Sequence, residues 1–150
     1  MTGTATIRYF EDVRVGETLP PLEKDISLVR MMAYGAATWD FVRLHYDADY
    51  VREYGLPSPP VDGQMLGAFL AQLVQDWAGR GSYLRKLSFQ NRGMVFSGDS
   101  ITCHGQVNAI HKSEGESLVE CDLWIENQRG EPVVRPASAT VRLPSRSESP

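Results

Sequence analysis

The stretch from Gly63 to Ala78 constrains the fold of this chain more than any other. In helical geometry its apolar side chains point in almost every direction; they are Met65, Leu66, Ala68, Phe69, Leu70, Ala71, Leu73, Val74 and Trp77. A helix that is apolar on all sides is normally buried on most of them. The rest of the chain must therefore fold around this helix.

The sequence pattern after Gly81 predicts β-strands. Four segments show partial period-two alternation with β-branched and aromatic enrichment: 83–95, 99–111, 117–127 and 132–143. A glycine marks each turn between them: Gly98, Gly115 and Gly130. Early helices, one buried helix and four meandering strands predict a single α+β domain in which an antiparallel β-sheet wraps around a central α-helix.

The part before Gly63 predicts a strand and two helices. Residues 22–26 suit a first strand, and Ser27 is a suitable N-cap for a helix over 28–38. A second, short helix over 47–54 should end at Gly55, and the proline-rich residues 56–60 cannot be helical. We expect the methionines near these elements to fill gaps in the core: Met31, Met32 and Met65.

Length and composition are those of one ordinary globular domain. The chain has 150 residues, of which 42% are hydrophobic and 23% charged, so it can bury a core without disulfides. Both ends are small and polar. We therefore expect disordered residues at 1–7 and 145–150 and a single domain over 8–144.

The charge pattern bears on possible partners. A formal net charge of −4 argues against a nucleic-acid partner, which would require clustered Lys and Arg. Four basic residues are candidates for local positive charge beside an anionic ligand, although an isolated basic residue is more often merely solvated: Arg80, Arg85, Lys86 and Arg92.

Cysteine usage and the N-terminal sequence bear on location. Cys103 and Cys121 lie in strand-like segments and form neither a disulfide framework nor a metal-ligand spacing. The N-terminus lacks a signal-peptide pattern, and no apolar run approaches the roughly 20 residues that cross a bilayer. We expect a cytoplasmic protein with no membrane partner.

Asp40 and His45 place a carboxylate and an imidazole between the two predicted helices. On a continuous helix, five residues rotate a side chain by about 140°, so both can act on one substrate only if the chain leaves the helix between them. One interpretation is an acid/base pair on a loop. The other is an Asp that ends a helix and a half-buried His, because polar residues are common at element ends.

The stretch Asp40-x-x-x-x-His45-Tyr46-Asp47, followed by a proline-rich turn and by Asp62-Gly63 before the apolar helix, resembles the MaoC-like family of (R)-specific enoyl-CoA hydratases and dehydratases. That family has roughly Asp-x-Asn-Pro-x-His, then His-Gly at the start of its central helix. The resemblance covers residues 8–143 and is strongest to small single-domain subunits that hydrate enoyl-CoAs in sterol side-chain breakdown. It implies a hot-dog fold.

Three positions depart from the family pattern. Val42 and Arg43 stand where the family has Asn and Pro, and Asp62 stands where it has the His of His-Gly. Asp40 and His45 match the two catalytic positions.

The resemblance implies a hydro-lyase of fatty acid or sterol metabolism that reversibly hydrates a trans-2-enoyl thioester to a 3-hydroxyacyl thioester. Asp40 and His45 would hold one water and supply both proton transfers. The family's glycine amide polarises the thioester carbonyl, and Gly63 at the helix N-terminus takes that position. Alternatively, Gly63 merely lets the chain turn into the helix. No cofactor and no metal are expected beyond the CoA or acyl-carrier-protein thioester of the substrate.

Three further residues are candidate supporting residues. Arg43 can pair with the substrate or with Asp47, Tyr46 can pack under the loop or offer its hydroxyl, and Asp62 can cap the helix. Because hot-dog thioesterases can use a carboxylate near the central helix, an acyl-CoA thioesterase that depends on Asp62 remains an alternative. Hot-dog domains usually pair, so we expect a homodimer or a heterodimer with a related hot-dog chain; a non-catalytic subunit of a heteromeric hydratase is a third hypothesis.

Overall fold

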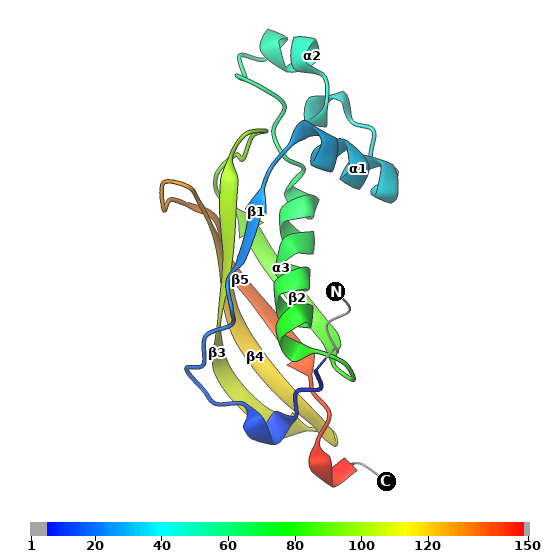
Figure 1. The fold of residues 1–150 in the computed structure, drawn as a ribbon, viewed down its shortest axis with the longest axis vertical. Helices are drawn as coiled ribbons and strands as arrows, with labels where there is room; N and C mark the ends of the chain where they lie inside the picture. Colours follow the sequence, from blue (N-terminus) through cyan, green and yellow to red (C-terminus); the bar gives the residue numbers. More distant parts are fainter. Residues whose placement is uncertain (1–5, 149–150) are drawn as a thin grey trace.

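A curved antiparallel sheet wraps around the helix α3, Gly63–Ala78, in the computed structural model, which describes residues 6–148 (Figure 1). Nine residues of α3 are buried, among them Leu70 and Val74, which are fully inaccessible to solvent. They pack with side chains of the inner sheet face such as Ile101, Leu123 and Ile125. The predicted central helix is confirmed, with the bounds that the apolar pattern indicated.

The sheet has five strands: β1 (Leu22–Asp25), β2 (Tyr83–Asn91), β3 (Ser100–Ser113), β4 (Glu116–Asn127) and β5 (Pro132–Arg142). Their order is β1-β3-β4-β5-β2, and all neighbours are antiparallel. The predicted four-strand meander is therefore wrong for β2, which pairs with β5 at the far edge. The turn before β3 does not return to β2 because it bonds to the chain after β1: Ile26 N–H donates to Asp99 O, and Gly98 N–H donates to Ile26 O.

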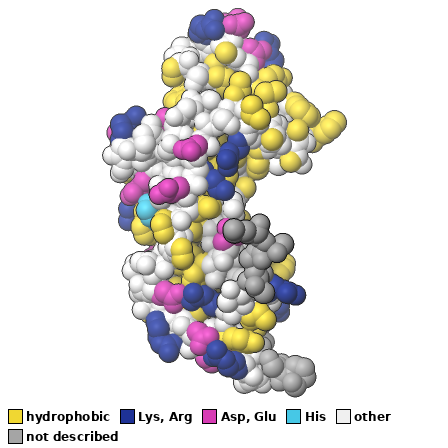
Figure 2. Space-filling view, viewed as in Figure 1, with side chains coloured by type: hydrophobic (Ala, Val, Ile, Leu, Met, Phe, Trp, Pro, Cys, Tyr) yellow, Lys and Arg dark blue, Asp and Glu magenta, His cyan; other side chains and the backbone are white. Residues whose placement is uncertain are grey.

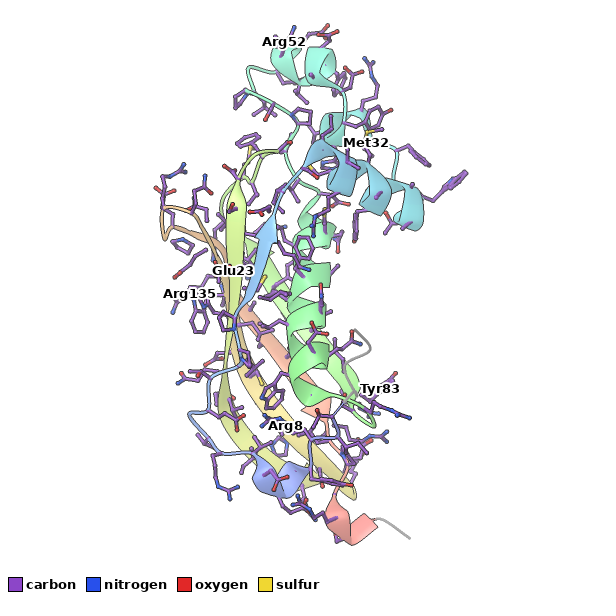
Figure 3. The ribbon with its side chains drawn as sticks, in the orientation of Figure 1. Arg8, Glu23, Met32, Arg52, Tyr83 and Arg135 are labelled. Atoms are coloured by element: carbon purple, nitrogen blue, oxygen red, sulfur yellow. The ribbon has the colours of Figure 1, made fainter. Side chains whose placement is uncertain are left out.

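Helices α1 (Leu28–Thr38) and α2 (Ala48–Glu53) lie at the end of the sheet where α3 begins (Figure 1). In Figure 3, Met32 and Arg52 mark this end, and Arg8 and Tyr83 mark the opposite one. Ser27 Oγ accepts a hydrogen bond from Arg30 N–H, which confirms the predicted N-cap of α1. Three short 3-10 helices complete the fold: Phe10–Asp12, Arg43–His45 and Arg146–Glu148. Within the described residues, no helix is both long and apolar enough to cross a membrane.

The ends of the described chain make contacts outside the predicted boundaries of 8 and 144. Thr6 O accepts a hydrogen bond from Arg80 N–H, and Ile7 bridges to Gly79. At the other end, Arg146 forms a bidentate ion pair with Asp12, at 2.7 and 2.9 Å. Residues 1–5 and 149–150 lie outside the described residues.

Two glycines of α3 let β2 approach the helix. A Cβ on Gly67 would lie 2.3 Å from the Phe89 ring, and one on Gly63 would lie 2.2 Å from Asn91 Nδ2. The Phe89 ring packs against α3, so a side chain at position 67 would clash with it, whereas a side chain at position 63 would require the exposed Asn91 side chain to move. The small residues in the predicted buried helix thus set the distance between α3 and β2.

We predict that Gly67→Ala destabilises the protein by about 1–3 kcal/mol, because the new methyl group must displace the Phe89 ring. The free energy of unfolding from urea titration measures this. Gln75→Ala on the exposed side of the same helix is the matched control and should stay within about 0.5 kcal/mol of the wild type. Equal stability of Gly67→Ala and wild type would contradict the close packing of β2 on α3.

Candidate active site

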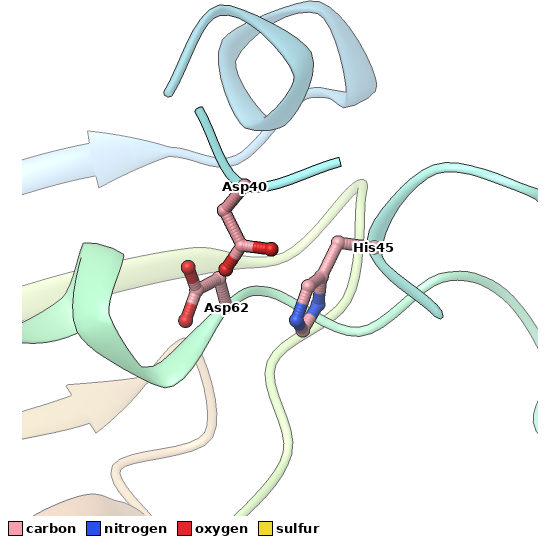
Figure 4. A group of neighbouring side chains, drawn as sticks. All are labelled: Asp40, His45 and Asp62. Atoms are coloured by element: carbon pink, nitrogen blue, oxygen red, sulfur yellow. The ribbon is translucent and has the colours of Figure 1, made fainter. Parts of the chain in front are cut away.

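Three side chains meet where α3 begins: Asp40 from the loop after α1, His45 from the end of the second 3-10 helix, and Asp62 from the N-cap of α3 (Figure 4). One carboxylate oxygen of each Asp and one ring nitrogen of His45 all lie within 4.8 Å of one another. All three residues are half-buried. The predicted convergence of Asp40 and His45 is confirmed in space, and Asp62 joins them.

The backbone leaves the α-helix just before Asp40. Trp39 adopts the left-handed conformation with φ of 59°, and Asp40 N–H donates to Gly35 O at 2.8 Å. A Cβ on Gly35 would lie 2.8 Å from Asp40 O, so this glycine lets the turning chain pass close to α1. Asp40 Oδ1 then accepts a hydrogen bond from Val42 N–H. These contacts turn the chain so that Asp40 and His45 share one side.

His45 is oriented by the stiff loop before α3. Its Nδ1 lies 2.9 Å from Pro60 O. A carbonyl oxygen only accepts hydrogen bonds, so the neutral imidazole carries its proton on Nδ1. Its Nε2 therefore retains a lone pair that can accept a hydrogen bond from a water molecule, as a general base requires.

Asp62 caps α3 and also lies beside Asp40 and His45. Its Oδ1 accepts a hydrogen bond from Gln64 N–H at 2.8 Å, which confirms it as the N-cap of α3. Its carboxylate also belongs to the cluster with Asp40 and His45. Within the part of the chain that the structure describes, these are the three residues whose carboxylate and imidazole donor atoms lie close enough to ligate one metal ion.

Gly63 is the first residue of α3, as predicted. A Cβ at this position would meet the end of the exposed Asn91 side chain, a flexible group that can move aside, so packing alone does not require glycine here. The role of the Gly63 N–H remains a prediction.

A cavity of about 90 Å³ lies beside the three side chains. It is lined by Met31, Met32, Tyr34, Gly35, Asp40, Phe41, His45, Tyr46, Asp62 and Met65. Since about 10–15 Å³ of such volume is enough for one water molecule, the cavity has room for several waters or for the reactive end of a small acyl group. Its walls are mainly apolar, with the two carboxylates and the imidazole at one side.

The cavity borders an exposed apolar surface. Figure 2 shows hydrophobic side chains gathered over α1 and the loop that follows. Trp39 is 82% exposed and contacts Phe41 edge to face, at 5.2 Å between ring centroids. The prediction that Met32 fills the core is wrong, because Met32 is 53% exposed while lining the cavity. Met31 and Met65 are buried as expected.

Arg43 holds the loop. Its Nε and Nη2 both donate to Asp47 Oδ2, at 2.9 and 2.8 Å, so the predicted pairing with Asp47 is confirmed. The hydrogen bond to Asp47 and, to a smaller extent, the negative charge of Asp47 raise the pKa of Arg43. Asp47 also caps α2 by accepting from Tyr50 N–H.

The other basic candidates lie away from the cavity. Among the described residues, none of its lining side chains is Lys or Arg. Arg85 pairs with Glu116 at 3.3 Å, and Arg92 donates to Gln90 and to Arg135 O. Positive charge beside the three site residues is therefore not supplied by these positions.

Tyr34 is a cavity residue that the sequence interpretation missed. Burial and, to a smaller extent, the carboxylates of Asp62 and Asp40 raise the pKa of the Tyr34 phenol. Its position three residues after the buried Met31 is the signal that could have found it, because residues i and i+3 share a helix face.

Two curated proteins are similar to this chain in sequence. The (R)-specific enoyl-CoA hydratase of Aeromonas caviae is 28% identical over 124 residues, which are 82% of this chain and 90% of that protein. The fatty acid synthase subunit beta of Gibberella zeae is 30% identical over 116 residues, which are 76% of this chain but only 5% of that protein. No protein-family model matches the chain.

Solved structures with the same architecture are numerous. The (R)-hydratase from A. caviae involved in PHA biosynthesis matches with a TM-score of 0.81 and 27% identity, over 89% of this chain and 99% of that one. The MaoC-like dehydratase from Rhodospirillum rubrum matches with a TM-score of 0.77 at 20% identity, over 93% and 98%. The ChsH1-ChsH2 complex from Mycobacterium tuberculosis matches with a TM-score of 0.79 at 22% identity, over 87% and 98%. The sheet-wrapped helix is therefore a hot-dog fold, as predicted.

The contact between His45 and Pro60 predicts the tautomer of His45. When the His45 imidazole is neutral, ¹⁵N NMR should show a protonated Nδ1 and an unprotonated Nε2. The reason is that Pro60 O is an acceptor and needs an N–H as its partner. His45→Gln identifies the signal. His111, an exposed residue of β3 outside the cavity, is the internal reference. A predominantly Nε2-protonated His45 would contradict the assigned hydrogen bond.

Proposed function

We propose that this chain, which shares its fold with a MaoC-like dehydratase and is similar in sequence to an (R)-specific enoyl-CoA hydratase, catalyses the reversible addition of water to a trans-2-enoyl thioester, forming a 3-hydroxyacyl thioester. The observation that carries this proposal is the meeting of Asp40 and His45 beside an apolar cavity at the start of α3. The reactive end of the substrate suits this cavity, whereas its CoA or acyl-carrier-protein carrier is too large for it.

The pair is suited to hold one water. Both the Asp40 carboxylate and His45 Nε2 are acceptors, so a water between them donates both of its O–H groups and turns its oxygen lone pairs outward. That oxygen attacks C3 of the substrate. One member of the pair removes a proton from the water and the pair delivers one proton to C2, so that the elements of a single water add across the double bond.

Negative charge that develops on the thioester oxygen needs a hydrogen-bond donor. The N–H of Gly63, in the first turn of a 16-residue helix, is suited to this role because unpaired amides and the helix dipole favour an anion there. No cofactor and no metal take part in this scheme.

An acyl-CoA thioesterase is a second candidate. Asp62 favours it, because this carboxylate joins the cluster that borders the cavity. In that reaction water attacks the thioester carbonyl, and the thiol is released. The two candidates therefore differ in product and in the carboxylate on which they depend.

We expect Asp40→Asn to lower the rate of enoyl-CoA hydration by about 10²- to 10⁴-fold, because the amide cannot act as a base. The loss of conjugated enoyl absorbance across short, long and ring-bearing trans-2-enoyl-CoAs measures hydration, and free thiol is followed in parallel. Asp76→Asn, an exposed position near the other end of α3, is the control and should retain full activity. EDTA should leave the rate unchanged.

Asp62→Asn separates the two candidates. If the wild type releases thiol, and this release is lost in Asp62→Asn but kept in Asp40→Asn, the protein is a thioesterase. That result would contradict the hydratase. If the wild type shows neither loss of enoyl absorbance nor release of free thiol, the result would favour a non-catalytic subunit that needs a partner chain.

We also propose that the chain pairs with a second hot-dog chain, either its own copy or a related one. β2 is a nine-residue strand at the edge of the sheet, hydrogen-bonded to β5 on one side. No strand among residues 6–148 pairs with its other edge, and natural proteins usually cover or pair such an edge. One of the similar structures is itself a complex, that of ChsH1 and ChsH2.

Light scattering on the purified chain should give twice the mass of one chain if it pairs with itself. A monomer that gains hydratase activity on addition of a related hot-dog chain would indicate the heterodimer instead. A fully active monomer would contradict pairing.

A further inference from the structure

The polar groups of the cavity are mainly acceptors. Five polar side chains line it: Tyr34, Asp40, His45, Tyr46 and Asp62. Both carboxylates accept hydrogen bonds, and His45 presents the unprotonated Nε2 because its Nδ1 proton is used by Pro60 O. An enoyl thioester adds one more acceptor, its carbonyl oxygen. The side-chain donors that remain are the two tyrosine hydroxyls.

The electrostatic surroundings distinguish the two tyrosines. Tyr34 interacts with the carboxylates of Asp62 and Asp40, which, after burial, are the causes that raise its pKa and keep its phenol protonated. Tyr46 interacts instead with Arg43, which is held in the ion pair with Asp47. Tyr34 lines the cavity together with Asp62, the N-cap of α3, and is therefore the tyrosine whose hydroxyl we assign to that end.

The position of Tyr34 is rigidly defined. Tyr34 packs against the hydrophobic core, and its neighbours Met31 and Gly35 are fixed by burial and by the close approach of Asp40 O. Its hydroxyl makes no hydrogen bond with any of residues 6–148. A donor without a protein partner, on a residue that packs against the core and lines a cavity rich in acceptors, is suited to a ligand acceptor.

We infer that Tyr34 is a catalytic residue whose hydroxyl donates a hydrogen bond to the carbonyl oxygen of the substrate thioester, beside the N–H of Gly63. The inference rests on the proposed hydration of an enoyl thioester. Tyr34 keeps its proton throughout: Asp40 and His45 carry out both proton transfers, and the phenol stabilises the negative charge that builds up on the oxygen. Loss of one such donor lowers kcat by about 10²- to 10³-fold in other enzymes.

The test uses 2,4-hexadienoyl-CoA, whose absorbance moves to longer wavelength when its carbonyl is polarised. We expect Asp40→Asn to bind this probe without turning it over, so that the shift reports on the hydrogen-bond donors alone. We expect Tyr34→Phe in the Asp40→Asn background to lose most of the shift while still binding the probe. Tyr54→Phe, an exposed residue outside the cavity, should retain it. As a single variant, Tyr34→Phe should lower kcat about 10²-fold with a much smaller change in KM.

The inference is overturned if Asp40→Asn and the double variant Asp40→Asn/Tyr34→Phe give the same absorbance shift. It is also overturned if Asp40→Asn binds the probe without any shift. A wild-type protein that hydrates no enoyl-CoA overturns the proposed function itself, which the hydration assay detects separately. Substitution of Tyr34 by 2,3-difluorotyrosine provides a second measurement, because its more acidic phenol is a stronger donor. This variant should enlarge the shift, and a reduced shift would count against a hydrogen bond from Tyr34.

Discussion

Burial of α3 against the sheet is the constraint on which the rest of the structure depends. Apolar residues on most sides of this helix leave it no stable place except under the sheet, and its two glycines bring β2 into contact with it. This packing fixes the N-terminus of α3, where Asp62 caps the helix. The cavity and the carboxylate-imidazole cluster lie at that end, so the core determines where chemistry can take place.

Local sequence rules were sufficient for the elements but not for their pairing. The apolar pattern predicted α3, and the rotation of a helix meant that Asp40 and His45 could meet only off a continuous α-helix; α1 ends at Thr38, before both residues, and they do meet. Strand alternation carries no information about partners, so the position of β2 beside β5 could not be inferred. Tyr34 was missed for a related reason: a cavity lining results from the packing of several elements, and no single segment encodes it.

The departures from the family pattern are accommodated by other contacts. Val42 cannot supply the polar side chain of the usual Asn, yet its backbone N–H donates to Asp40 Oδ1, and Arg43 ties the loop to Asp47. The substituted Asp62 caps α3 through one oxygen. The loop is thus held in place by a backbone hydrogen bond and an exposed ion pair. Neither interaction depends strongly on which side chains lie next to it.

The segment 28–54 supplies Asp40, His45 and much of the cavity wall, yet Met31 and Val51 are its only residues in the described structure that are fully buried. Most substitutions in this segment therefore leave the stability of the sheet and α3 nearly unchanged. Eight of the ten residues that line the cavity belong to 28–54, and the other two, Asp62 and Met65, belong to the N-cap and first turn of α3. The cavity therefore joins a rigid floor, set by the buried helix, to a wall whose side chains can change with little effect on the core.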